Sequence, residues 1–166
     1  MTVLPILAWP DKRLTQTCKP VSVLAEVQEL AADMLETMYA ADGRGLAAPQ
    51  VGAMCRVFVI DTGWKEGKPD PIVMINPMLQ EVGEQTVVNT EGCLSIAGVT
   101  AEVRRPTTVR MQWTSLDGAQ MLQGFSGFSA VCVQHELDHL DGIVTLDHLD
   151  AETRADVEAE YAVVGP

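Results

Sequence analysis

The segment from Gln134 to His139 carries the residues best suited to chemistry. His135 and His139 are four residues apart, so on a helix their imidazoles lie on one face, about 6 Å apart along the axis. Both can therefore reach one metal ion, and Glu136 beside them can hold a water on that ion and take its proton. The spacing predicts a metal-dependent hydrolase with Glu136 as the general acid/base.

A catalytic site of this kind usually takes a third protein ligand, and several residues compete for that place. Cys132 shares the helical face but lies roughly 10 Å along the axis from the second histidine, so we expect it to line the pocket. One class of zinc protease needs a histidine at position 145, where this chain has Thr145. Another class draws a glutamate from a later helix, which Glu158 or Glu160 could supply. Cys93, in a glycine-flanked turn after a predicted strand, can offer a thiolate.

The stretch 43–50 reads Gly-Arg-Gly-Leu-Ala-Ala-Pro-Gln and has the composition of a loop that approaches a ligand closely. Gln50 can offer an amide donor to an oxyanion. The stretch lacks the Lys-Ser/Thr pair of a phosphate loop and the glycine spacing of a dinucleotide fingerprint. In isolation, it fits an oxyanion-binding loop and a tight structural turn equally well.

Helices and strands must bring these segments together. The apolar spacing predicts an amphipathic helix from Ser22 to Ala41, a buried helix from about Ser129 to Asp141 that carries the histidines, and a short acidic helix from Asp150 to Tyr161. The region 56–117 is rich in β-forming residues. The predicted strands are Val57–Asp61, Ile72–Ile75, Gln85–Val88 and Thr107–Trp113, and an Asp-Gly turn predicts a hairpin to a strand at Gln120–Gly124.

The composition and charge of the chain limit its domain class, its binding partners and its location. Of 166 residues, 47% are hydrophobic and 20% charged, which is typical of one globular domain. The net charge of −12 disfavours direct nucleic-acid binding, and we expect Arg104, Arg105 and Arg110 at a solvated strand edge. The four cysteines lack a disulfide framework, and we find no export signal or membrane-spanning run. A cytoplasmic location is therefore expected.

The segments 43–50, 91–95 and 134–139, in this order, resemble the three sequence motifs of the peptide deformylase family. Further matching residues extend the resemblance over roughly 4–149; they are Pro5, Pro10, Arg13, Leu14, Asn76, Pro77, Arg105 and Gly142. The resemblance implies an α+β fold in which antiparallel sheets surround the central motif-bearing helix, with one catalytic domain over 1–166.

The family resemblance also implies a role for each motif residue. It makes Cys93 the third ligand, so that one ion per chain is held by Cys93, His135, His139 and a water. Ferrous iron is the implied metal, with zinc, nickel or cobalt able to replace it. The implied catalytic residues are Glu136 for proton transfer and Gln50 with the backbone amide of Leu94 for the oxyanion, while Gly45 approaches the substrate backbone.

The implied reaction removes the formyl group from the N-terminal formylmethionine of newly made polypeptides and releases formate. The partners would be formylated nascent peptides, with at most weak contact to the ribosome, because the C-terminal segment is acidic. The alternatives are a zinc peptidase that uses a downstream glutamate and a deformylase-like paralogue with another substrate preference.

The sequence departs from the family pattern where the methionine side chain is expected to bind. Arg44 replaces an aliphatic residue between two glycines, Asn89 stands where a hydrophobic residue is common, and Phe128 changes a third pocket position. Val131 and Cys132 complete the expected pocket. The departures leave hydrolysis of a formyl amide as the firm expectation and the preferred first side chain open.

Overall fold

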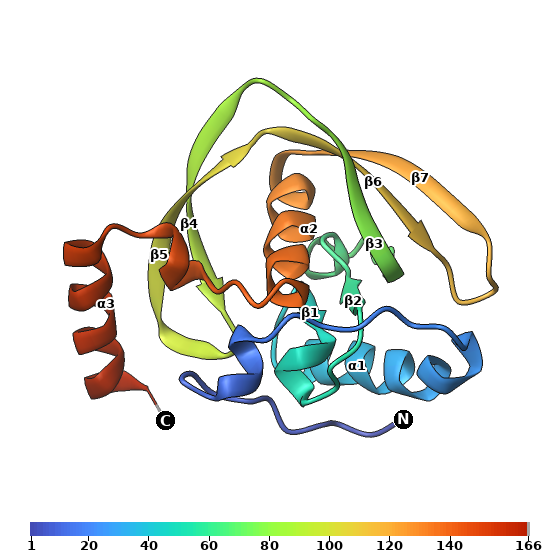
Figure 1. The fold of residues 1–166 in the computed structure, drawn as a ribbon, viewed down its shortest axis with the longest axis horizontal. Helices are drawn as coiled ribbons and strands as arrows, with labels where there is room; N and C mark the ends of the chain where they lie inside the picture. Colours follow the sequence, from blue (N-terminus) through green and yellow to red (C-terminus); the bar gives the residue numbers. More distant parts are fainter. Residues whose placement is uncertain (166) are drawn as a thin grey trace.

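Seven strands form two antiparallel sheets in the computed structural model, which describes residues 1–165. The larger sheet has the order β1-β2-β3-β6-β7, and the smaller sheet is the hairpin β4-β5 (Figure 1). The strands are β1 (Gly45–Ala47), β2 (Val57–Ile60), β3 (Ile72–Val82), β4 (Thr86–Cys93), β5 (Ile96–Pro106), β6 (Thr108–Thr114) and β7 (Gln120–Ser126). The expected α+β fold with antiparallel sheets is confirmed.

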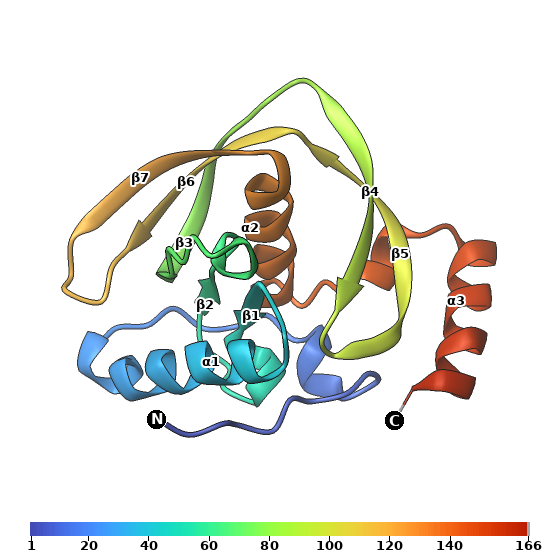
Figure 2. The same cartoon turned by 180° about the vertical axis from the view of Figure 1, so that it is seen from behind.

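Helix α2 (Gly127–Leu140) stands between the two sheets (Figures 1 and 2). Its buried residues include apolar side chains such as Ala130 and Val133, which pack into the core formed with the larger sheet. Gly142 follows the helix with a φ of 75°, the left-handed conformation expected for a C-terminal cap. The buried, motif-bearing helix predicted from the sequence is therefore confirmed, starting two residues earlier than expected.

The other two helices lie at the periphery. Helix α1 (Gln28–Ala40) buries Ala31, Met34 and Met38 against the larger sheet, and α3 (Ala151–Val164) lies outside the β4-β5 hairpin (Figure 2). The prediction that the first helix starts at Ser22 was wrong. Residues 24–27 form a 3₁₀ turn, and no side chain caps it or the start of α1. No helix in the described part of the chain has the length and apolar character to cross a membrane.

Two strands extend beyond their predicted ends. The apolar pattern of β3 breaks at Asn76, whose φ is +50°, and the strand resumes after a shift in register between Ile75 and Met78. The Asn76 side chain bonds both backbone groups of Val21 at 2.8 Å, which holds this irregularity in place. Strand β4 continues to Cys93, so this cysteine is the last residue of a strand and not part of a turn after it.

Strand β5 was not predicted as a separate strand, although it lies in the β-rich region. It pairs with β4 along nearly its whole length, and its buried residues alternate with exposed ones. The hairpin of β6 and β7 was predicted correctly, with Gly118 at a φ of 88° in its turn. The β4-β5 hairpin carries the second motif to the face of α2.

The N-terminal segment holds the first two motif segments together through backbone hydrogen bonds. The Leu7 amide donates to the carbonyl of Gln50 at 2.7 Å, and the Trp9 amide donates to the carbonyl of Ser95 at 2.8 Å. The loop around Gln50 and the end of the β4-β5 hairpin are thereby fixed relative to one another. Both segments then face the same side of α2.

Candidate functional site

Three potential metal ligands converge from the end of β4 and the second half of α2. The Sγ atom of Cys93 and one ring nitrogen each of His135 and His139 all lie within 4.8 Å of one another. The separation between Cys93 Sγ and His139 Nε2 is 3.3 Å. In a tetrahedral site with ligands about 2.0–2.3 Å from the ion, the ligand atoms are roughly 3.3–3.8 Å apart. The three residues therefore fit one divalent metal ion.

The competing ligands lie elsewhere. Among residues 1–165, no cluster of potential metal ligands includes Glu158, Glu160 or Cys132. On α3, Glu158 accepts a hydrogen bond from Arg154 Nε at 2.9 Å, and Glu160 is exposed. The geometry does not bring either downstream glutamate to the histidines.

Burial sets the protonation of the second histidine. His139 is 1% exposed, and burial, with the nearby charges of His135 and Arg105, places its pKa well below the ordinary value. His139 is thus neutral at physiological pH. Neutral imidazole is the form of histidine that binds a metal ion.

Glu136 lies on the same helical face as the histidines and is 4% exposed. Burial raises the pKa of its carboxyl to about 7, against the opposing charges of His135 and Arg105. Within residues 1–165, its Oε2 atom has no hydrogen-bond partner. A carboxyl with a pKa near 7 and one free oxygen is suited to accept and return a proton.

Gly45, the first residue of β1, lies against this carboxylate. A Cβ atom at position 45 would overlap Glu136 Oε1 and would lie 2.8 Å from Glu136 Cδ and 3.0 Å from Cys132 Sγ. Only glycine leaves room for the buried carboxylate here. The glycine at position 45 is therefore required by the close approach of β1 to α2.

Gln50 is held in a fixed orientation beside the cluster. Its Oε1 atom accepts a hydrogen bond from the Ala47 amide at 2.9 Å, and its Nε2 atom donates to Ser95 Oγ at 3.1 Å. The same Nε2 atom lies 3.6 Å from Cys93 Sγ. Leu94 lines the pocket next to these residues. An amide donor thus points to the place where the ion and its ligands would sit.

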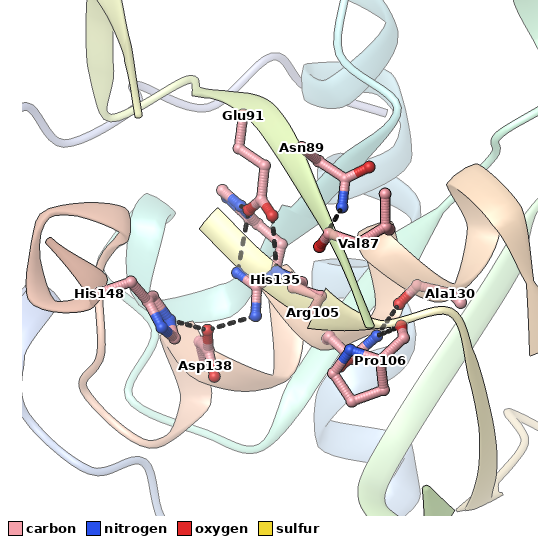
Figure 3. A network of polar contacts seen from close by, with 10 residues as sticks. Val87, Asn89, Glu91, Arg105, Pro106, Ala130, His135, Asp138 and His148 are labelled. Carbon is pink, nitrogen blue, oxygen red and sulfur yellow. Dashed lines mark hydrogen bonds and ion pairs between the residues drawn. The ribbon is translucent and has the colours of Figure 1, made fainter. Parts of the chain in front are cut away.

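A buried network of charged groups supports His135 (Figure 3). Glu91 Oε1 lies 2.9 Å from His135 Nδ1, and both Glu91 oxygens accept hydrogen bonds from Arg105, at 2.6 and 2.9 Å. Arg105 also donates to Asp138 Oδ2 at 2.9 Å, and His148 Nε2 lies 2.8 Å from that same oxygen. Because Nδ1 of His135 is engaged by Glu91, its Nε2 is left to face the ion.

The expectation that Arg105 lies at a solvated edge was wrong. Arg105 is 4% exposed, while its neighbour Arg104 is exposed. On β5 the buried residues Ala101, Val103 and Arg105 alternate with exposed ones, so Arg105 occupies an inward position. This period-two alternation was the signal in the sequence that could have identified it.

From the buried ion pair of Glu91 and Arg105 we predict an effect on the free energy of unfolding. Replacing Arg105 by alanine leaves the Glu91 carboxylate buried without its main partner, so we expect a loss of about 3–5 kcal/mol in the free energy of unfolding. The matched control is Arg104→Ala on the outward face of the same strand, where we expect a change below about 0.5 kcal/mol. Urea unfolding of both variants measures the difference. Equal losses from the two variants would contradict the role given to Arg105.

A pocket of about 620 Å³ runs from the ligand cluster along α2. Its wall on α2 consists of Phe128, Val131, Cys132, His135 and Glu136, a set with the three- and four-residue spacing of one helical face. Val131 and Cys132 are each 7% exposed, whereas Phe128 is 56% exposed. The pocket therefore leads from the buried cluster toward the surface at the start of α2.

Arg44 and Asn89 line the same pocket from the two sheets. The Arg44 guanidinium donates two hydrogen bonds to Glu66, at 2.9 and 2.6 Å, and one to the carbonyl of Thr62. Its central carbon lies 5.3 Å from the ring centre of Phe128. The structure thus brings the expected pocket residues together, with the charge of Arg44 already paired.

Comparisons with known proteins identify the family of the chain. The family model described as polypeptide deformylase matches residues 3–155. A peptide deformylase of Rhodopseudomonas palustris strain TIE-1 is 45% identical over 97% of this chain and 94% of its own. One from Zymomonas mobilis is 46% identical over 90% of this chain and 87% of its own.

Solved structures of peptide deformylases have the same fold as this chain. A peptide deformylase from Legionella pneumophila superimposes with a TM-score of 0.92 at 34% identity, covering 98% of this chain and 95% of its own. A peptide deformylase from Ehrlichia chaffeensis in complex with actinonin gives 0.91 at 34% identity, with all of both chains covered. By sequence and by fold, the chain belongs to the polypeptide deformylase family.

Proposed function

We propose that this chain removes the formyl group from the N-terminus of formylated peptides by hydrolysis, with Cys93, His135 and His139 as ligands of its metal ion. The chain is a metal-dependent hydrolase of the deformylase family. The observation that carries the assignment of ligands is the convergence of a thiol and two imidazoles within 4.8 Å, beside a buried carboxyl. The peptidase alternative lacks its glutamate ligand at this place, since Glu158 pairs with Arg154.

In the proposed mechanism, Glu136 handles the proton. Cys93, His135 and His139 would hold a divalent ion, which would supply Lewis acidity to a water and to the formyl oxygen. Glu136 accepts the proton of the attacking water at its free Oε2 atom, and the oxygen of that water adds to the formyl carbon. When the carbon–nitrogen bond breaks, Glu136 gives the proton to the leaving amine. The products are formate and a peptide with a free N-terminal amine.

Gln50 and the backbone amide of Leu94 are proposed to bind the oxygen of the formyl group as it becomes negative. The Gln50 amide is held by Ala47 and Ser95 before substrate arrives, so no free energy is needed to orient it during the reaction. Gly45 is proposed to approach the substrate backbone, and its lack of a side chain leaves room for the Glu136 carboxylate. The pocket along α2 then receives the first side chain of the peptide.

We infer that the physiological metal is ferrous iron. One thiolate and two imidazoles can bind iron, zinc, nickel or cobalt, and the ligand set alone does not select among them. The proposal of iron rests on the similarity of the three motifs to the family. One ion per chain is expected, because the described residues contain a single ligand cluster.

We further propose that residues 1–166 form one catalytic domain that acts on newly made polypeptides in the cytoplasm. The four cysteines are free, which is consistent with a reducing compartment. The acidic charge supports encounter with nascent chains by diffusion or by weak contact with the ribosome, without direct nucleic-acid binding.

The proposed function is tested on protein prepared without oxygen and loaded with ferrous iron. We expect release of formate from a formyl-Met tripeptide and no release of acetate from the acetyl-Met tripeptide. We also expect the activity of the iron form to decay in air. The nickel and zinc forms, whose starting activity is equal to or lower than that of the iron form, should keep their activity. Formate is measured with a coupled dehydrogenase assay. If metal-loaded protein hydrolyses no formyl peptide, the proposed function is wrong; stable activity of the iron form in air would contradict iron.

A further inference from the structure

The pocket beside the ligand cluster contains a polar group that the proposed mechanism does not use. Asn89 lies on β4, two residues before Glu91, so the two side chains project from the same face of the strand. Its partner across the hairpin is Val103, which is fully buried. Asn89 therefore faces inward and lines the pocket beside α2. Figure 3 shows it on the same strand as Glu91.

The carboxamide of Asn89 is poorly satisfied by the protein. Within residues 1–165, its hydrogen-bond contact is from Nδ2 to the carbonyl of Val87 at 3.5 Å, the outer limit of such a bond. The Oδ1 atom and the second hydrogen of Nδ2 remain available. A half-buried amide in this condition gains free energy when a ligand group pairs with it.

Arg44 is not available to bind a polar group of a ligand in the pocket. Its two terminal nitrogens are engaged by Glu66 and the carbonyl of Thr62, and its guanidinium lies over Phe128. Glu66 and Thr62 line a separate, smaller hollow, while Arg44 and Phe128 line both hollows. Arg44 and Phe128 thus form a wall at the far end of the pocket, with the positive charge paired on the other side.

The position of Asn89 matches the far part of a substrate side chain. Two residues of strand cover about 6.8 Å, so Asn89 lies about that far from Glu91, which contacts His135. A first side chain that starts near the ligand cluster and follows α2 passes Cys132 and Val131 before it reaches the Arg44–Phe128 wall. Asn89 lines the same pocket, so its carboxamide is available to the outer part of that side chain.

We propose that Asn89 is a specificity-determining residue that allows this site to accept N-formyl peptides whose first side chain bears a hydrogen-bond-accepting oxygen on its δ atom. Glutamine and methionine sulfoxide belong to this class, and both have nearly the shape of methionine. The Asn89 Nδ2 group donates to this oxygen, while the apolar walls contact the rest of the side chain. This inference rests on the proposed function of the chain.

The proposal is tested with three formyl tripeptides that differ only in the first residue: methionine, glutamine and methionine sulfoxide. For the wild type, we expect kcat/KM for the two polar substrates to lie within about tenfold of the methionine value, because one hydrogen bond offsets the cost of bringing the polar group into the pocket. In Asn89→Leu, we expect the polar substrates to fall by at least about tenfold relative to methionine. Asn89→Ala removes the amide without adding bulk and should show the same relative loss.

The control is Val88→Leu, on the outward face of the same strand, where the side chain is 42% exposed and does not line the pocket. It should leave the ratios unchanged. A wild-type preference for methionine above about tenfold, or ratios that do not respond to either Asn89 variant, overturns the proposal.

Binding of the same peptides to Glu136→Gln, measured by calorimetry, separates this inference from the proposed function. We expect Glu136→Gln to bind the methionine and methionine sulfoxide peptides with similar affinities. If these affinities diverge in the double variant that also carries Asn89→Leu, the role of Asn89 is supported, whatever the rate of hydrolysis. Affinities that stay in the same ratio in the double variant overturn it.

Discussion

Replacing Glu136 by glutamine should lower kcat by about 10²–10⁴-fold while the metal content stays at one ion per chain. Glutamine has nearly the size of glutamate, so it fills the space between Gly45 and Cys132, but it cannot accept the proton of the attacking water. The ligands Cys93, His135 and His139 are unchanged. The measurements are steady-state hydrolysis of a formyl-Met peptide and elemental analysis of the purified variant.

The control for this experiment is Glu160→Gln. Glu160 is an exposed residue of α3 and belongs to no ligand cluster among residues 1–165. Its replacement should change neither activity nor metal content. Glu136→Gln with near-normal kcat would show that another group transfers the proton, and a large loss in Glu160→Gln would revive the peptidase alternative.

Replacing Cys93 by alanine should remove the metal ion. Loss of an outer-shell partner typically weakens metal binding 10- to 100-fold, so loss of a direct ligand should exceed about 100-fold. We therefore expect the purified variant to contain little metal and to show no measurable hydrolysis. Elemental analysis and titration with cobalt, followed by absorbance, measure the two effects.

Cys132→Ala is the matched control, because Cys132 is a second thiol that lines the same pocket, from α2. It lies outside the ligand cluster, and its Sγ contacts the carbonyl of Arg44 at 3.6 Å. This variant should keep its metal. Metal retained in Cys93→Ala but lost in Glu158→Ala would contradict the proposed ligands.

The sequence was most informative where one helix carries the chemistry. The spacing of His135, Glu136 and His139 depends only on helical geometry, so it predicted a shared face before any fold was known. The third ligand could not be derived in this way. Cys93 reaches the histidines only because β4 extends to it and pairs with β5, a contact between segments distant in sequence. The resemblance to the family supplied Cys93, and the fold brings it to the histidines.

The predictions from the sequence were wrong for residues whose environment is set by tertiary packing. Arg105 has the side chain of a surface residue, and its burial depends on Glu91 and Asp138, which lie on other elements. Ser22 has the chemistry of a helix cap, but the chain makes a 3₁₀ turn before α1 begins at Gln28. The intrinsic preference of a residue for a helix or for the surface does not take account of the residues that pack against it in the fold.

The two sides of the ligand cluster belong to elements far apart along the chain. Cys93 ends β4, His139 lies on α2, and 46 positions separate them. An ion that binds all three ligands therefore closes a long loop, and it binds the folded chain far better than the unfolded one, where the ligands are dispersed. At a free concentration 1,000 times its dissociation constant, such an ion adds about 4.1 kcal/mol to the free energy of unfolding. An ion that fills this site would therefore stabilise the folded chain as well as take part in its reaction.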